Sequence, residues 1–147
     1  PKLIMNLKLF LNKKIPTIVG LDHISYRINP IDRWFNFYFE AKERGLDPLW
    51  TINHGWISGI YYKDPDGNLV EIFFEHFSSA EEFKSNISPD FEDEPIGTNM
   101  DVEVLYEMYK AGSDFSELIT KGNTVPEGKK PVSGFDAVVN MKKKFKD

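Results

Sequence analysis

The feature of this sequence that most constrains its fold is a tight turn, DPDGN at residues 64–68, between two apolar segments. Proline favours the first corner of such a turn, and the glycine supplies the positive φ that closes it. The flanking segments, 56–63 and 69–75, are rich in branched and aromatic residues. The sequence therefore predicts an antiparallel hairpin.

A strand and a helix are predicted before this hairpin. From residue 21 the apolar residues recur at every second position, which places Ile24, Tyr26 and Ile28 on one face of a strand. Asn29-Pro30 then marks a helix start, with asparagine as the N-cap and proline in the first turn. An apolar, aromatic stripe continues the helix to about residue 44. We expect the apolar face of the strand to pack against this helix.

A further short strand at residues 49–52 completes the order strand, helix, strand, strand, strand. The predicted fold class is therefore α+β, with one β-α-β-β-β module on a curved mixed sheet at residues 21–76. Residues 1–20 are interpreted as a linker, or as the remnant of a preceding module whose last strand lies at 4–10.

The chain changes character after the module, and residues 77–147 are predicted to be a helical and extended tail that packs on it. Ser79 and Glu82 have the spacing of a capping box for a short helix. Apolar residues at helical spacing predict a second helix at 101–111. Residues 113–147 carry several prolines and glycines, and we interpret them as an extended strap with a frayed end.

Composition excludes several classes of protein. Hydrophobic residues make up 41% of the chain and aromatic residues 14%, which is enough for a core. The net charge of -5 gives no electrostatic reason to expect a nucleic acid or an anionic membrane as partner, and the basic segment 142–146 is interpreted as a solvated tail. There is no cysteine, which excludes disulfides and thiolate metal sites and fits a cytoplasmic location. No apolar run approaches the roughly 20 residues that span a bilayer, and no signal peptide is expected.

Two polar residues are predicted to converge on the sheet. His23 lies on the strand face opposite the helix, and Glu71 shares its own strand face with Leu69 and Phe73. If the helix covers one face of a curved sheet, His23 and Glu71 both point to the concave face. A histidine and a carboxylate in an apolar cup are suitable ligands for a divalent metal.

Each candidate also has a simpler interpretation. A single histidine on a strand is commonly hydrogen-bonded, and a carboxylate in an apolar run such as that around Glu71 can be ion-paired instead. By pattern alone, His54 is a surface histidine in the turn before a strand, and His76, just past the last strand, faces solvent. Tyr61 is predicted on the strand face opposite its two apolar neighbours.

Several segments form a recognisable combination. They are GLDHISY at 20–26, NHG at 53–55, YYKDPDGNLVE at 61–71 and PIGTNMD at 95–101, followed by a Gly-x-x-x-x-Glu-Leu stretch at 112–118. Together they resemble the vicinal oxygen chelate superfamily, the glyoxalase/bleomycin resistance/extradiol dioxygenase group. Within it they are most similar to the catalytic module of the catechol and biphenyl-diol ring-cleaving enzymes, over about residues 15–122.

The resemblance implies a role for each candidate. His23 and Glu71 match the metal ligands of the first and last strands of the catalytic module. His54 matches a histidine that assists proton transfer and oxygen activation, and Tyr61 matches a tyrosine that holds the substrate oxygen. The implied metal is Fe(II), with Mn, Ni or Zn as alternatives, in a site of two histidines and one carboxylate that takes a vicinal diol and O2.

The third ligand is expected from elsewhere. In the family a preceding module supplies the other histidine, but about twenty residues precede Leu21 here, and none is histidine. The chain could be part of a longer or split dioxygenase that is completed by a separate complementary module. Two copies could instead pair as a homodimer and place two histidines and two glutamates around a shared metal. This is the ligand set of glyoxalase-type lyases or isomerases, which act on dicarbonyl-type substrates. It could also be a catalytically inactive binding module of the same fold.

Overall fold

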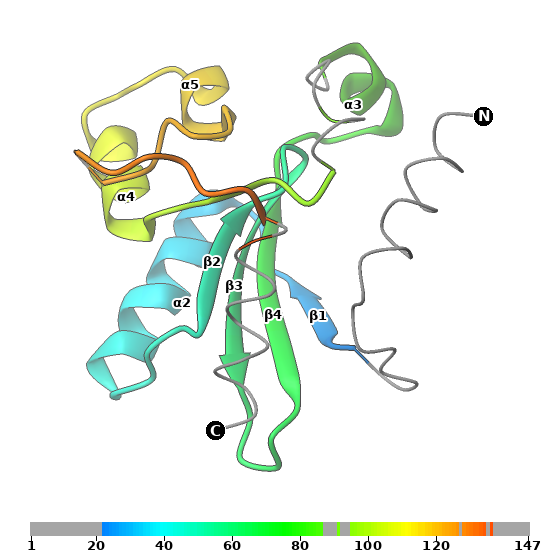
Figure 1. Cartoon of the computed structure of the whole chain (residues 1–147). Coiled ribbons are helices and arrows are strands. Elements are labelled where there is room, and N and C mark those ends of the chain that lie inside the picture. The colour runs from blue at the N-terminus through cyan, green and yellow to red at the C-terminus, as the bar shows by residue number, and fades with distance from the viewer. Residues whose placement is uncertain (1–21, 87–90, 92–94, 127, 135, 137–147) are drawn as a thin grey trace.

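Within the residues that the computed structural model describes (22–86, 91, 95–126, 128–134 and 136), a curved five-stranded mixed sheet with helices packed on it gives the chain an α+β fold (Figure 1). In chain order the elements are β1 (Ile24–Arg27), α2 (Ile31–Glu43), β2 (Trp50–Asn53), β3 (Ile57–Lys63), β4 (Leu69–Glu75), α3 (Ala80–Asn86), β5 (Thr98–Asn99), α4 (Val102–Lys110) and α5 (Phe115–Ile119). From β1 to β4 they follow the predicted order of strand, helix and three strands.

The strands lie in the order β1-β4-β3-β2-β5. β1 runs parallel to β4, and the other neighbouring strands are antiparallel. The predicted hairpin is confirmed as β3 and β4. In its turn, Asp64 Oδ1 accepts a hydrogen bond of 2.6 Å from the backbone N–H of Asn68, and Gly67 has a φ of 87°, which glycine adopts without strain.

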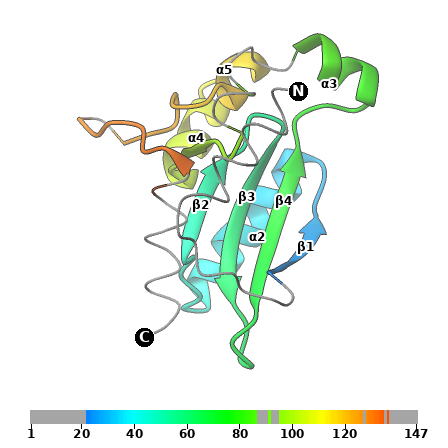
Figure 2. The same ribbon diagram turned by 45° about the vertical axis from the view of Figure 1, so that its right-hand side comes forward.

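Helix α2 covers one face of the sheet, and Figure 2 shows it behind β3 and β4. Its aromatic stripe forms the main core with α4, α5 and alternate residues of β3 and β4, as the predicted period of two requires. Trp34 is fully buried, and its indole Nε1 donates a hydrogen bond of 3.0 Å to the carbonyl of Ile72. The other sheet face is left for a smaller apolar cluster of Ile52, Tyr61 and Leu69.

The first strand is less covered than its pattern predicts. Ile24 is 39% exposed and Tyr26 is 55% exposed, so the expected packing of both against the helix is wrong. Only Ile28, the third residue of that face, packs against the main core. The reason is the strand order, because α2 packs against β4 whereas β1 lies one strand further out, at the edge of the described sheet.

The start of α2 also differs from the prediction. The N-cap is Pro30 and the helix begins at Ile31, so Asn29 is not the cap. The side chain of Asn29 instead accepts a hydrogen bond of 3.1 Å from the backbone N–H of Glu75. This bond ties the start of the helix to the end of β4.

The tail contains more helix than predicted. The two predicted helices are confirmed as α3 and α4, and Ser79 Oγ caps α3 by accepting 3.1 Å from the backbone N–H of Glu82. α5 was not predicted, and it lies inside the segment interpreted as a strap. Further along, that segment does run beside β5, where the backbone N–H of Val132 donates 2.6 Å to Asn99 Oδ1.

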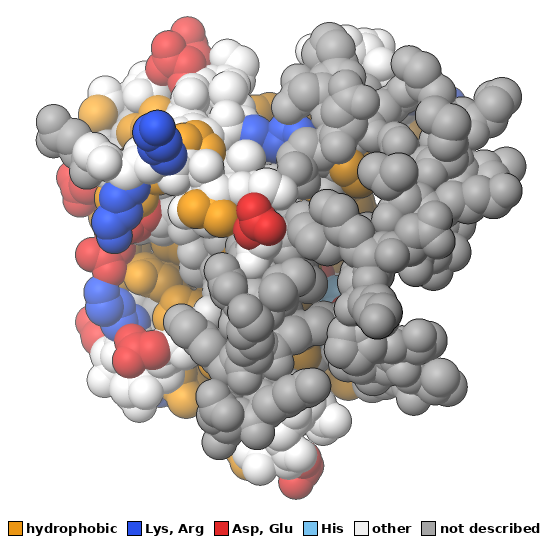
Figure 3. All heavy atoms as spheres, in the orientation of Figure 1, with side chains coloured by type: hydrophobic (Ala, Val, Ile, Leu, Met, Phe, Trp, Pro, Cys, Tyr) orange, Lys and Arg blue, Asp and Glu red, His pale blue; other side chains and the backbone are white. Residues whose placement is uncertain are grey.

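The predicted strand at 4–10 and the predicted solvated tail at 142–146 lie outside the described residues. Among the helices that are described, none has the length and apolar character needed to cross a membrane. At the left edge of the view in Figure 3, basic and acidic side chains lie close together. An ion pair between Lys42 and Glu103 joins α2 and α4.

Candidate functional site

Glu71 lies at the centre of the candidate site. It sits on β4, on the sheet face opposite α2, and is only 3% exposed. The strand register places Ser25 of β1 beside it on one side and Tyr61 of β3 on the other. A carboxylate at such a depth is costly unless polar groups or a cation compensate its charge.

His23, directly before β1, and Ser25 on β1 both approach Glu71. His23 Nε2 lies 3.4 Å from Glu71 Oε2, and the Ser25 hydroxyl donates a hydrogen bond of 2.6 Å to the same oxygen. On its other side, His23 Nδ1 lies 2.9 Å from Asp22 Oδ2. A carboxylate on one ring nitrogen orients the imidazole and leaves the other nitrogen for a ligand.

His54 and Tyr61 approach from the other side. His54 Nε2 lies 3.7 Å from Glu71 Oε1 and 3.4 Å from the Tyr61 hydroxyl. The turn that carries His54 is fixed by the buried Asn53, whose Oδ1 accepts 2.7 Å from the backbone N–H of Gly55. His54 is therefore a partly buried member of this cluster, and the interpretation of it as a surface histidine is wrong.

The charge state of the cluster follows from burial and from polar neighbours. Burial raises the pKa of the Glu71 carboxyl, but its polar neighbours outweigh burial and bring the net pKa below its usual value. The neighbours responsible are His54, Ser25 and Tyr61. Burial raises the pKa of the Tyr61 hydroxyl, and the Glu71 charge raises it further. At neutral pH the site thus holds an ionised carboxylate beside a protonated phenol.

The donors present fit a divalent metal in part. Within the described part of the chain, Glu71 Oε1 is buried without a hydrogen-bond partner. The 3.4 Å from His23 Nε2 to Glu71 Oε2 suits two ligands of one ion, since metal–ligand bonds are about 2.0–2.2 Å. Among the described residues, however, no group of three histidine or acidic side chains is placed to hold a metal. The described part of the chain therefore offers a pair of ligands, not a closed set.

Sequence reasoning missed two members of this cluster, Asp22 and Ser25. Both lie inside the segment GLDHISY, and Ser25 on β1 is two residues after His23, which directly precedes that strand. The period of two could have identified Ser25, but its contact with Glu71 depends on the pairing of β1 with β4.

His76 was expected to face solvent, and this prediction is wrong. It is 4% exposed, with its ring against Phe74 and its Nε2 2.8 Å from the Ser58 hydroxyl. Burial lowers the pKa of His76 to about 3, so the ring is neutral in the folded protein. The backbone N–H of His76 bonds to the carbonyl of Trp56 and so continues the β3–β4 pairing past the end of the strand.

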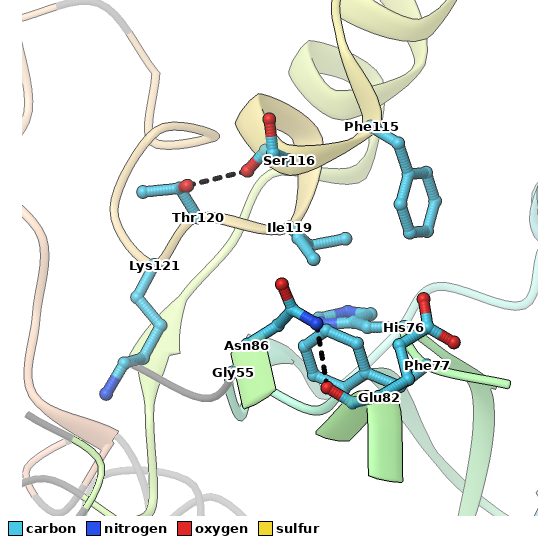
Figure 4. A pocket seen from close by; sticks show the side chains of 10 residues that line it. All are labelled: Gly55, His76, Phe77, Glu82, Asn86, Phe115, Ser116, Ile119, Thr120 and Lys121. Atoms are coloured by element: carbon cyan, nitrogen blue, oxygen red, sulfur yellow. Dashed lines mark hydrogen bonds between the residues drawn. The ribbon is translucent and has the colours of Figure 1, made fainter. Parts of the chain in front are cut away.

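A cavity of about 550 Å³ lies between α3 and α5 at the end of the sheet (Figure 4). Phe115 and Ile119 of α5 face His76 and Phe77 across it, and Lys121 lies at one side. None of the four predicted site residues lines this cavity. It is therefore separate from the polar cluster around Glu71.

Two curated proteins are similar in sequence to this chain. A protein named biphenyl-2,3-diol 1,2-dioxygenase 3, from Rhodococcus globerulus, is 31% identical over 112 residues, which are 76% of this chain and 59% of that protein. Biphenyl-2,3-diol 1,2-dioxygenase 2 from the same organism is 28% identical over 111 residues, 75% of this chain and 58% of that protein. No protein-family model matches the chain, and no solved structure matches it. The chain thus spans less than two thirds of the length of these relatives, and over about three quarters of its own length it is similar to proteins named as diol dioxygenases.

Proposed function

We propose that this chain carries the carboxylate side of a non-heme Fe(II) site for extradiol cleavage of a vicinal diol. The observation that carries the proposal is the pairing of His23 Nε2 with the buried Glu71 carboxylate at 3.4 Å. The names of two relatives, both biphenyl-2,3-diol dioxygenases, support the same chemistry. His23 and Glu71 would be the ligands, and Mn, Ni or Zn could occupy the same donors.

His23 and Glu71 would hold the Fe(II), which would bind the diol and bring it next to O2. The protein's task is to keep the carboxylate ionised and to exclude competing ligands. The lowered pKa of Glu71 keeps the carboxylate ionised, and its 3% exposure limits the access of competing ligands. Asp22, at 2.9 Å from His23 Nδ1, orients the ring so that Nε2 faces the carboxylate.

His54 and Tyr61 would handle the substrate's proton and oxygen. Because the pKa of Tyr61 is raised, its hydroxyl stays protonated and can donate a hydrogen bond to a substrate oxygen. His54 Nε2, 3.4 Å from that hydroxyl, can exchange a proton with the diol as a general acid or base. Both groups lie on the sheet face of Glu71, so they would meet a substrate held there.

The third ligand must come from outside the described cluster. A further part of the same protein or a separate complementary module could provide it, since the chain spans 59% and 58% of the two relatives. A second copy is the other candidate, in which two histidines and two glutamates would serve a lyase or isomerase acting on a dicarbonyl-type substrate. The exposed Ile24 and Tyr26 on β1, at the edge of the described sheet, favour a partner on that side.

Mass and oxygen consumption test the proposal together. The chain is loaded with Fe(II) without oxygen, its mass is measured by light scattering, and 2,3-dihydroxybiphenyl and O2 are then added. Once the third ligand is supplied, we expect one O2 consumed per diol and a product heavier by two oxygen atoms. The same assay is run on a form of the chain that also carries any residues its own gene encodes before residue 1. Metal at one per dimer without oxygen consumption would favour the lyase or isomerase, and absence of metal in every form would leave an inactive binding module.

A further inference from the structure

The two oxygens of Glu71 have different surroundings. Oε2 accepts a hydrogen bond of 2.6 Å from Ser25 and lies 3.4 Å from His23 Nε2. Oε1 is buried, has no hydrogen-bond partner among the described residues and lies 3.7 Å from His54 Nε2. A hydrogen bond therefore fixes the Oε2 side of the carboxylate, and the position of Oε1 depends on the packing around it.

Ser25 restricts the first oxygen. β1 and β4 are parallel, and Ser25 is the register partner of Glu71 although 46 residues separate them in the sequence. The short side chain reaches Oε2 directly, and a hydrogen bond to a charged oxygen is stronger than one between neutral groups. Ser25 therefore holds Oε2 on the β1 side, next to His23.

Gly59 leaves room for the second oxygen. It lies on β3 opposite Phe73, which places it diagonally across from Glu71 on the same sheet face. A Cβ added at Gly59 would lie 3.3 Å from Glu71 Cδ and 3.4 Å from Cγ, and would overlap Oε1 itself. Its φ is not in the left-handed region, so the backbone alone would accept alanine, which strands tolerate better than glycine. A side chain at position 59 would thus compete with the carboxylate for the same space.

We infer that Ser25 and Gly59 are positioning residues for Glu71: Ser25 tethers Oε2, and the bare backbone at Gly59 makes the space that Oε1 occupies. This inference deepens the proposed function, because a carboxylate set in this way is prearranged as a ligand beside His23. The packing of Gly59 against Glu71 does not require a metal. It can therefore be tested on the metal-free chain.

The first test is a double-mutant cycle followed by urea unfolding of the metal-free protein. Gly59→Ala should lower the unfolding midpoint in the wild-type background and have no such effect in the Glu71→Ala background, where the overlap is gone. If Gly59→Ala does not fold, recovery of folding in the double variant gives the same answer. An equal loss in both backgrounds would overturn the role of Gly59. In the same way, equal losses for Ser25→Ala with and without Glu71→Ala would overturn the tether.

The second test measures Mn(II) affinity by calorimetry. Ser25→Ala should weaken binding by about 10–100-fold, the range for residues that orient a ligand, and Ser25→Thr, which keeps the hydroxyl, should restore it. Ser58→Ala is the matched control, because the Ser58 hydroxyl bonds to His76 rather than to Glu71. The Mn(II) affinity of this variant should equal that of the wild type. Unchanged affinity in Ser25→Ala would overturn the link to metal binding. If Glu71→Ala binds Mn(II) as the wild type does, the proposed function fails, while the unfolding cycle still decides the positioning role.

Discussion

The buried imidazole of His76 predicts a specific loss of stability in mild acid. In the unfolded chain His76 has an ordinary pKa of about 6.5, whereas burial lowers the folded-state pKa to about 3. Between these values the unfolded chain binds a proton that the folded chain does not, so acid favours unfolding. The contribution of the neutral His76 ring to the free energy of unfolding is intact above pH 6.5. Below that pH it falls by up to about 1.4 kcal/mol per pH unit, or by about 2 kcal/mol from pH 7 to pH 5.

Urea unfolding at pH 7 and pH 5 measures this effect. His76→Gln keeps a group that can bond to Ser58 but removes the titration, so its loss of stability between the two pH values should be smaller than that of the wild type by about 2 kcal/mol. Ser58→Ala is the control, because it removes the hydrogen bond and leaves the histidine. The same pH dependence in His76→Gln and in the wild type would refute the argument.

Three further substitutions test the fold. Trp34→Phe should cost about 1–3 kcal/mol in urea unfolding, because it removes the pyrrole part of a fully buried indole and its hydrogen bond; a loss within error of zero would contradict the core described above. Gly97→Ala should cost more than Gly112→Ala, since both have positive φ but an added Cβ meets backbone only at Gly97; thermal melts of equal midpoint would contradict this. Asp101→Ala should cost about 1 kcal/mol because two N-cap hydrogen bonds are lost, whereas Asp114→Ala, whose side chain makes no cap bond, should be near neutral in the same unfolding assay.

Much of the sheet can be predicted from the sequence because its signals are local. A turn with Gly67 at positive φ and a period of two on either side define β3 and β4, and they also decide which face Glu71 occupies. The contact between His23 and Glu71 is less local, since it requires β1 to lie parallel to β4. The family resemblance indicates that His23 and Glu71 act together, whereas strand parity alone indicates only that they share a sheet face.

The failed predictions concern positions whose surroundings come from distant parts of the chain. His76 is buried by Phe77 and by elements after the sheet, which the local pattern at a strand end does not indicate. Ile24 has the pattern of a covered strand, but its exposure is set by its place at the sheet edge. α5 is five residues long and lies in a segment rich in turn-forming residues, so its helical signal is weak.

The central claim is that His23 and Glu71 bind a divalent metal, and the metal content of matched variants tests it most directly. The wild type, Glu71→Ala and Glu75→Ala are dialysed to equilibrium against Fe(II) without oxygen and analysed for bound iron. Glu75 is the control because it lies on the same strand but pairs with Arg27 near the surface. The account predicts that Glu71→Ala loses the metal while Glu75→Ala retains it at the wild-type level. Equal iron in the wild type and in Glu71→Ala would contradict it.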